Sequence, residues 1–232
     1  MNDISIVSLS IMLIPFLSVI GIQFLWGTDY KKSLYALLRM ITQLILVGYI
    51  LMFLFGLQHS YEVLVVLLLM LFIASWISLN YNPVIRRILL FKSFIALVVG
   101  SGITIVIIFT FVLDLDPWYQ PRYTIPLSGM IFANSMSAIS LASDRFFSDI
   151  KNNLSYIKAR NNAYKASLIP ITNSFFAVGL VSIPGMMSGA VLSGSDPLVA
   201  ARYQILVMLM LFSSSGLSVA FFLNSIRGIK ID

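Results

Sequence analysis

Seven long apolar runs, separated by short polar stretches, dominate this 232-residue sequence. Each run has about 20 residues, the length that an α-helix needs to cross a hydrocarbon core of about 30 Å. The pattern therefore predicts an all-α, polytopic membrane protein whose residues 1–232 form a single transmembrane domain. The predicted spans are Ile4–Trp26, Ser33–Phe55, Tyr61–Leu79, Phe91–Leu113, Tyr123–Ala142, Ser167–Leu192 and Ala201–Leu223.

Composition narrows the chemistry that this chain can carry. Charged residues make up only 10% of it, against about 25% in ordinary soluble domains. Cysteine is absent, so disulfides and thiolate metal sites are excluded. His59 is the one histidine. No HExxH, P-loop or GxSxG pattern occurs. We therefore expect a transport protein and not an enzyme, with no cofactor bound by this chain and with metal ligands that the sequence does not identify.

The net charge of +6 is distributed very unevenly between the two sides of the predicted spans. An amino terminus outside the cell places thirteen of the 15 basic residues on the cytoplasmic flanks and leaves two on the other side. Such asymmetry is the positive-inside pattern, so we expect a cytoplasmic carboxyl terminus and a location in the inner (plasma) membrane. It also argues against nucleic acid as a partner. The two outer residues are Arg122 and Arg202.

Ionisable side chains are almost absent from the interior of the predicted spans. Proton-coupled transporters need such a group at membrane depth, so the pattern favours energy supplied by another protein. Arg39 alone lies inside a span, about one turn from its cytoplasmic start. Two roles remain open for it: an anchor at the cytoplasmic edge, or a partner for a cytoplasmic group or an anionic ligand.

Uncharged polar side chains within the spans have two interpretations. Gln43 lies four residues after Arg39, on the same helix face, and Asn134 lies in the middle of the fifth span. Amides in membrane helices commonly hydrogen-bond to neighbouring helices, with about 0.6 to 2 kcal/mol for each bond. The alternative is that Gln43 and Asn134 line a translocation path.

The sixth span contains an unusual stretch, "GLVSIPGMMSG", from Gly179 to Gly189. Pro184 removes a backbone donor and clashes with the carbonyl of Leu180, which predicts a kink or break suited to a hinge or outer gate. Gly185 and Gly189 are four residues apart, a spacing that also allows two helices to approach closely. Met186 and Met187 have three open roles: packing, gating, or ligation of a soft metal ion.

A long polar segment, Asp144–Ala166, follows the fifth span. Phe146, Phe147, Ile150, Leu154 and Ile157 recur at helical spacing among basic residues, which predicts an amphipathic helix that continues from the span. It would either lie on anionic lipid or dock a cytoplasmic partner. The residues we assign to coupling with a partner are Leu154, Ile157, Lys158, Arg160 and Lys165.

Four stretches carry a resemblance to a known family. They are "RMITQLILVGYIL" (Arg39–Leu51), "VVGSGIT" (Val98–Thr104), "IPLSGMIFANSMSAISL" (Ile125–Leu141) and "SLIPITNSFFAVGLVSIPGMMSGAVLSGSDPLVAARYQILVMLML" (Ser167–Leu211). In these the chain resembles the FetB (YbbM) family, the membrane subunits of a class of bacterial ABC transporters. The last stretch is the most specific, with Pro-Gly-Met-Met, Asp-Pro and Tyr-Gln in order.

This resemblance implies a permease without ATPase activity, which works as a homodimer with separately encoded ATP-binding subunits that bind ATP and Mg²⁺. Bacterial members are associated with iron export, which implies a metal ion as cargo. Plant relatives leave open an organic solute such as a nucleotide sugar. One departure from the family's sequence pattern leaves a third alternative open, an uncoupled channel or scaffold. The family carries a Gly-centred turn before "LIP", whereas here no glycine occurs between Gly129 and Gly179.

Overall fold

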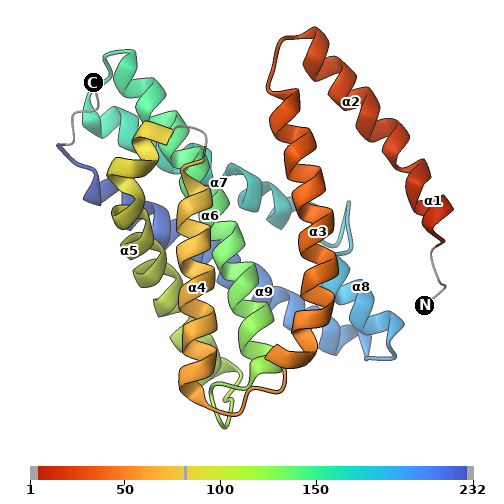
Figure 1. Ribbon diagram of the computed structural model, residues 1–232. Coiled ribbons are helices and arrows are strands. Elements are labelled where there is room, and N and C mark those ends of the chain that lie inside the picture. The colour runs from red at the N-terminus through yellow and green to blue at the C-terminus, as the bar shows by residue number, and fades with distance from the viewer. Residues whose placement is uncertain (1–4, 81–82, 229–232) are drawn as a thin grey trace. The chain divides into compact units, whose positions relative to one another are not determined.

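The computed structural model describes residues 5–80 and 83–228, and these ranges contain helices but no strand (Figure 1). The predicted all-α, polytopic class is confirmed. The chain divides into two units, one ending at Gly56 and one beginning at Leu57, and each is described by itself.

The first unit contains three helices: α1 (Ile6–Ile11), α2 (Leu13–Leu25) and α3 (Tyr30–Leu54). The turn between α2 and α3 includes Gly27 at φ +67°, a conformation that glycine adopts without strain. The two helices pack against each other, yet neither buries a residue. Their apolar side chains therefore remain available to lipid or to other protein surfaces.

The second unit is a helical bundle around two long central helices, α6 and α9 (Figure 1). Helix α6 contacts α4, α5, α7 and α9, whereas α9 contacts α5 through α8. The elements of this unit are α4 (Ser60–Ser78), α5 (Pro83–Ile107), the π-helical turn η1 (Ile108–Val112), α6 (Pro121–Lys151), α7 (Tyr156–Ala177), α8 (Gly185–Leu192) and α9 (Pro197–Ser225).

Small and hydroxyl-bearing side chains bring the helices of this bundle close together. A Cβ atom added to Gly100 on α5 would lie only 2.4 Å from the backbone nitrogen of Ser218 on α9. Ser78 and Ser93 share a buried hydrogen bond of 2.8 Å between α4 and α5. Without water, serine hydroxyls satisfy one another or backbone carbonyls, and their small size permits the close crossing.

Six helices in the described ranges are long and apolar enough to cross a membrane, against the seven spans expected. The predicted sixth span, Ser167–Leu192, is not among them, because these residues are divided between α7, a seven-residue loop and α8. The six candidate spans are Ser8–Leu25, Tyr30–Leu54, Ser60–Ser78, Arg86–Val112, Pro121–Lys151 and Pro197–Ser225.

The amphipathic segment Asp144–Ala166 also differs from its prediction. Helix α6 does continue past the fifth span, but it ends at Lys151, and α7 begins only at Tyr156. Between them Asn153 adopts φ 61°, a left-handed conformation that asparagine tolerates better than most residues. The turn changes the helical phase, so Phe146 is buried whereas Ile157 is 61% exposed, and the expected single apolar face does not form.

Candidate functional site

An irregular loop, Val178–Pro184, separates α7 from α8. The Ala177 carbonyl accepts hydrogen bonds from the backbone N–H groups of Leu180, Val181 and Ser182, and the N–H of Gly179 bonds to the Ser182 carbonyl. Gly179 has φ +84°, so the helix cannot pass through it. The expected break exists, but it begins near Gly179.

Pro184 lies at the far end of this loop and does not interrupt a running helix as expected. It is the N-cap residue of α8, with φ −61° and ψ 145°, and its carbonyl accepts the N–H of Ser188 at 2.9 Å. The predicted clash with the Leu180 carbonyl does not arise, because Leu180 is already outside a helix. Proline suits this position because a helix start leaves backbone donors unpaired in any case.

A cavity of about 500 Å³ lies beside the break, between the end of α7, α8 and the first turns of α9. Nearly all of its lining is apolar, and no titratable side chain contributes to it. Its lining residues are Phe175, Val178, Gly179, Ile183, Pro184, Met187, Ala201, Gln204, Ile205, Met208 and Leu209.

Gln204 is the one side-chain amide that lines this cavity, and sequence reasoning did not select it. The side chain is only 5% exposed, and its Oε1 atom has no hydrogen-bond partner. An unpaired buried acceptor lowers the stability of the fold by about 1 to 3 kcal/mol. A buried group of this kind therefore calls for a functional explanation. The signal in the sequence is the Tyr203-Gln204 pair, which contributes to the family resemblance but carries no information about a cavity.

The two adjacent methionines of α8 face different spaces. Met187 lines the cavity beside the break, whereas Met186 lines a second cavity of about 430 Å³ together with Arg122, Tyr203 and residues of α6. They therefore do not form a joint thioether site. A Cβ added at Gly185 or Gly189 would meet nothing within 4 Å, so neither residue makes a close helix contact within this chain. No group of three His, Cys, Asp or Glu side chains suited to a metal ion occurs in the described ranges.

The other residues assigned to a translocation path do not belong to the linings of the two cavities beside α8. Asn134 is half-buried, and its Nδ2 donates to the Met130 carbonyl of its own helix at 3.4 Å. It lines neither of the two cavities beside α8. Gln43 is exposed on α3 and Arg39 is half-buried on the same helix, both in the first unit.

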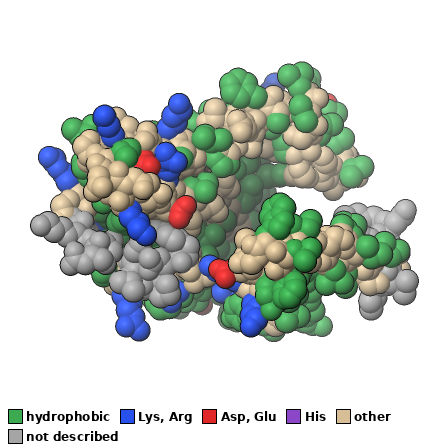
Figure 2. Space-filling model, turned by 90° about the horizontal axis from the view of Figure 1, so that it is seen from above, with side chains coloured by type: hydrophobic (Ala, Val, Ile, Leu, Met, Phe, Trp, Pro, Cys, Tyr) green, Lys and Arg blue, Asp and Glu red, His purple; other side chains and the backbone are tan. Residues whose placement is uncertain are grey.

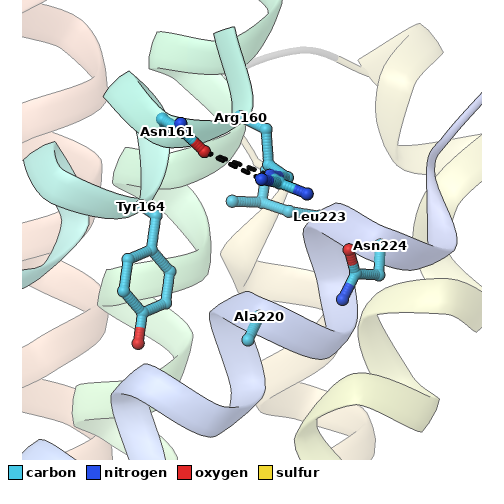
Figure 3. Close-up of a pocket in the computed structure, with 6 residues that line it drawn as sticks. All are labelled: Arg160, Asn161, Tyr164, Ala220, Leu223 and Asn224. Carbon is cyan, nitrogen blue, oxygen red and sulfur yellow. Dashed lines mark hydrogen bonds between the residues drawn. The ribbon is translucent and has the colours of Figure 1, made fainter. Parts of the chain in front are cut away.

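The residues assigned to coupling separate into two groups on the turn and α7. Ile157, Lys158 and Lys165 are exposed, and Leu154 is half-buried in the turn. Arg160 instead faces α9, where it lines a third cavity of about 290 Å³ (Figure 3). This cavity is lined from α7 by Arg160, Asn161 and Tyr164, and from α9 by Ala220, Leu223 and Asn224.

Basic side chains gather at the end of the bundle that holds this third cavity (Figure 2). Hydrogen bonds join the elements there: Lys92 of α5 donates to the Ser225 carbonyl of α9, and the Tyr156 hydroxyl of α7 donates to the Leu223 carbonyl at 3.0 Å. Arg122 lies in the second cavity, beside residues of α8 and the early turns of α9. The region of α5 with Lys92, the start of α7 with Arg160 and the end of α9 thus meet at one end of the unit, where basic residues gather.

Comparison with known proteins identifies the family of this chain. The model of the family described as "Uncharacterised protein family (UPF0014)" matches residues 6–228. The chain belongs to the UPF0014 family. A UPF0014 membrane protein of Synechocystis is 40% identical over 198 residues, which cover 78% of this chain and 75% of that protein. No solved structure matches.

Two further UPF0014 relatives have names that describe a role. The "Probable iron export permease protein FetB" of Escherichia coli is 34% identical over 203 residues, covering 81% of this chain and 77% of that protein. "Protein ALUMINUM SENSITIVE 3" of Arabidopsis thaliana is 27% identical over 202 residues, covering 81% of this chain and 72% of that protein. The resemblance to the FetB family drawn from the sequence motifs is confirmed.

Proposed function

We propose that this chain is the permease subunit of an ABC transporter that exports iron or another metal ion, with energy from a separate ATP-binding subunit. The similarity to the Escherichia coli protein named as a probable iron export permease supports the cargo class. The six apolar helices support a membrane permease. ATP and Mg²⁺ would bind in the partner subunit, and this chain would hydrolyse nothing.

The observation that carries the proposal is the broken helix beside a cavity that contains Gln204. In lipid, backbone that leaves helical geometry is tolerated only where protein covers it or where it lines a wet cavity. The loop Val178–Pro184 borders such a cavity, and the unpaired Oε1 atom of Gln204 supplies its polar group. The loop lacks a continuous helical ladder of hydrogen bonds and is exposed at Leu180 and Val181, features suited to a gate that moves next to the flexible side chain of Met187.

The source of energy follows from the chemistry of the cavity lining. No carboxylate, histidine or lysine contributes to the cavity beside the break, so coupling to a proton has no group to act on there. Energy from ATP hydrolysis needs a surface that the ATP-binding subunit can move. The exposed residues Ile157, Lys158 and Lys165 on the first turns of α7 supply such a surface, and α7 leads directly to the break.

Assembly and orientation complete the proposal. The basic residues that gather where α5, α7 and the end of α9 meet support a cytoplasmic location for that end and for the carboxyl terminus. The protein would lie in the inner (plasma) membrane as a homodimer. In that assembly the exposed apolar side chains of the break, such as the 90% exposed Leu180, would contact lipid or the second copy.

One observation favours a second candidate, an exporter of an organic solute. The cavity beside the break is apolar apart from one amide, and the described ranges hold no group of metal-ligating side chains. Pockets for organic molecules typically combine an apolar lining with a few polar groups. A metal ion would then cross in complex with an organic ligand, or the cargo would contain no metal.

Co-expression with the candidate ATP-binding subunit tests the proposal. We expect the two chains to co-purify through a tag on one of them, and we expect ferrous iron to stimulate ATP hydrolysis after reconstitution in liposomes. Stimulation by an organic solute and not by iron would select the second candidate. Failure to co-purify would favour the uncoupled channel or scaffold.

The role of the helix break has its own test. Pro184→Ala allows α8 to extend backward and should abolish transport while the protein still inserts in the membrane. Normal transport by this variant would exclude a gating role for Pro184. Gly21→Ala is a matched control on α2, because a Cβ there meets nothing within 4 Å.

A further inference from the structure

The third cavity lies at the boundary between the apolar bundle and its basic end. Ala220 and Leu223 form an apolar wall on the last turns of the candidate span α9, whereas Arg160, Asn161, Tyr164 and Asn224 bring hydrogen-bond donors (Figure 3). No acidic side chain lines the cavity. A site rich in donors beside an apolar wall at the end of a membrane helix matches an amphipathic anion.

The guanidinium of Arg160 is held in place but its charge has no counter-ion in the cavity. Its Nε and Nη2 atoms donate to Oδ1 of Asn161 at 3.2 and 3.0 Å, and that amide is neutral (Figure 3). Arg160 also lies 5.9 Å from the ring centroid of Tyr156. The ring of Tyr156 is shared with Arg227, whose guanidinium lies 5.8 Å from the same centroid. Asn161 occupies the Nε edge of the guanidinium, and the remaining N–H groups of this oriented cation are suited to a phosphate group.

A purely structural role at the end of α9 does not account for Arg160. Cations are often found at a helix C-terminus because they pair with the last carbonyl groups. Here Lys92 already donates to the Ser225 carbonyl, and the hydroxyl of Tyr156 donates to the Leu223 carbonyl. Arg160 makes both of its hydrogen bonds to Asn161 and none to α9.

We propose that the cavity between Arg160 of α7 and Asn224 of α9 binds the phosphate headgroup of an anionic phospholipid. The phosphate would contact Arg160 and Asn224, and the glycerol and first acyl carbons would lie along Ala220 and Leu223. Basic pockets beside the ends of membrane helices are where anionic headgroups bind, and α9 is such a candidate membrane helix. The site goes beyond the proposed transport function and does not depend on it.

The position of the site indicates its effect on the protein. A bound headgroup would contact both the start of α7 and the end of α9. The other end of α7 leads to the helix break, and the early turns of α9 border the cavity that contains Gln204. We therefore expect anionic lipid to stabilise the packing of α7 against α9. This effect can be measured on the full chain alone, so its failure is distinguishable from a failure to couple with an ATP-binding subunit.

The experiment uses the full chain purified in a neutral detergent. Phosphatidylglycerol, phosphatidylcholine, glycerol 3-phosphate or inorganic phosphate is added, and the thermal unfolding midpoint and lipid binding by native mass spectrometry are measured. We expect phosphatidylglycerol alone to raise the midpoint. Arg160→Gln should weaken its binding about tenfold, the loss expected for one charge-assisted hydrogen bond. Arg87→Gln removes an exposed arginine of α5 and should leave the binding unchanged.

Several outcomes would overturn the proposal. An equal loss of binding in Arg160→Gln and Arg87→Gln would mean general charge attraction, and an equal effect of inorganic phosphate would mean a free anion instead of lipid. Unchanged lipid binding together with lost co-purification of the ATP-binding subunit would assign Arg160 to protein docking. If Arg160→Gln does not fold, Arg160→Lys and Asn224→Leu replace it. Arg160→Lys keeps the charge without the guanidinium, and each variant should weaken phosphatidylglycerol binding; unchanged binding in both would refute the site.

Discussion

The carboxylate of Asp149, near the end of α6, accepts a hydrogen bond of 2.8 Å from the side-chain amide of Asn162 on α7. Asp149 is only 4% exposed, and its other oxygen lies 3.2 Å from Nε of Arg145. The bond from Asn162 connects the two helices across the turn that contains Asn153, and the pair with Arg145, within α6, orients the carboxylate. The turn thus has a fixed geometry, which a segment that transmits movement from a partner requires.

Removal of the Asn162 amide should weaken this connection. Asn162→Ala leaves the buried carboxylate with one partner fewer, which costs about 1 to 3 kcal/mol. We expect a lower thermal unfolding midpoint in detergent. Asn173→Ala makes the same change at an exposed position of the same helix and should have little effect. Equal midpoints for the two variants would show that the hydrogen bond between Asn162 and Asp149 does not stabilise the fold.

The contact between α5 and α9 at Gly100 gives a second prediction with a matched control. A Cβ at Gly100 would meet the backbone of Ser218, so Gly100→Ala must move the two helices apart, at a cost of about 1 to 3 kcal/mol. Two residues further along α5, a Cβ at Gly102 would meet nothing within 4 Å. Gly102→Ala should therefore leave the unfolding midpoint unchanged or raise it slightly. A lower midpoint for Gly102→Ala than for Gly100→Ala would contradict the close crossing of α5 and α9 at Gly100.

Gly179 should resist substitution for a different reason, its backbone conformation. At φ +84° a side chain costs about 1 to 2 kcal/mol, although there is open space around the position. Gly179→Ala should lower the unfolding midpoint, whereas Gly189→Ala, within helix α8, should not. Hydrogen exchange across the loop Val178–Pro184 would show whether the loss is local. A Gly179→Ala variant as stable as the wild type would indicate a different loop structure.

The sequence predicted the helices better than the site, for identifiable physical reasons. Long apolar runs determine most spans, because bilayer thickness and backbone hydrogen bonding leave few alternatives. The break in residues 167–192 was expected at Pro184, since proline has a local rule that can be read directly. The departure at Gly179 depends on a positive φ, which glycine permits but does not impose.

Gln204 was not assigned to the translocation path, although it belongs to the Tyr-Gln pair of the family resemblance, because its place in a cavity arises from tertiary structure. The sequence pattern of a span does not distinguish an amide that faces a neighbouring helix from one that faces a cavity. Only the packing of the helices distinguishes the two. The separation of Met186 from Met187 has the same origin, because neighbours on a helix point about 100° apart and can enter different spaces. The placement of Arg160 against α9, away from the exposed lysines of α7, is likewise a product of packing.

Replacement of Gln204 should separate stability from transport. Gln204→Met keeps most of the side-chain volume and removes an unpaired buried acceptor, so we expect the free energy of unfolding to rise by about 1 kcal/mol. If the amide contacts cargo, transport should fall roughly tenfold or more. Gln23→Met is the matched control, since Gln23 on α2 also has an unpaired Oε1 atom but does not line the cavity. Both variants should gain stability, measured as a raised unfolding midpoint, and only Gln204→Met should lose transport, measured as cargo flux in vesicles. Normal flux in Gln204→Met would exclude this cavity from the translocation path.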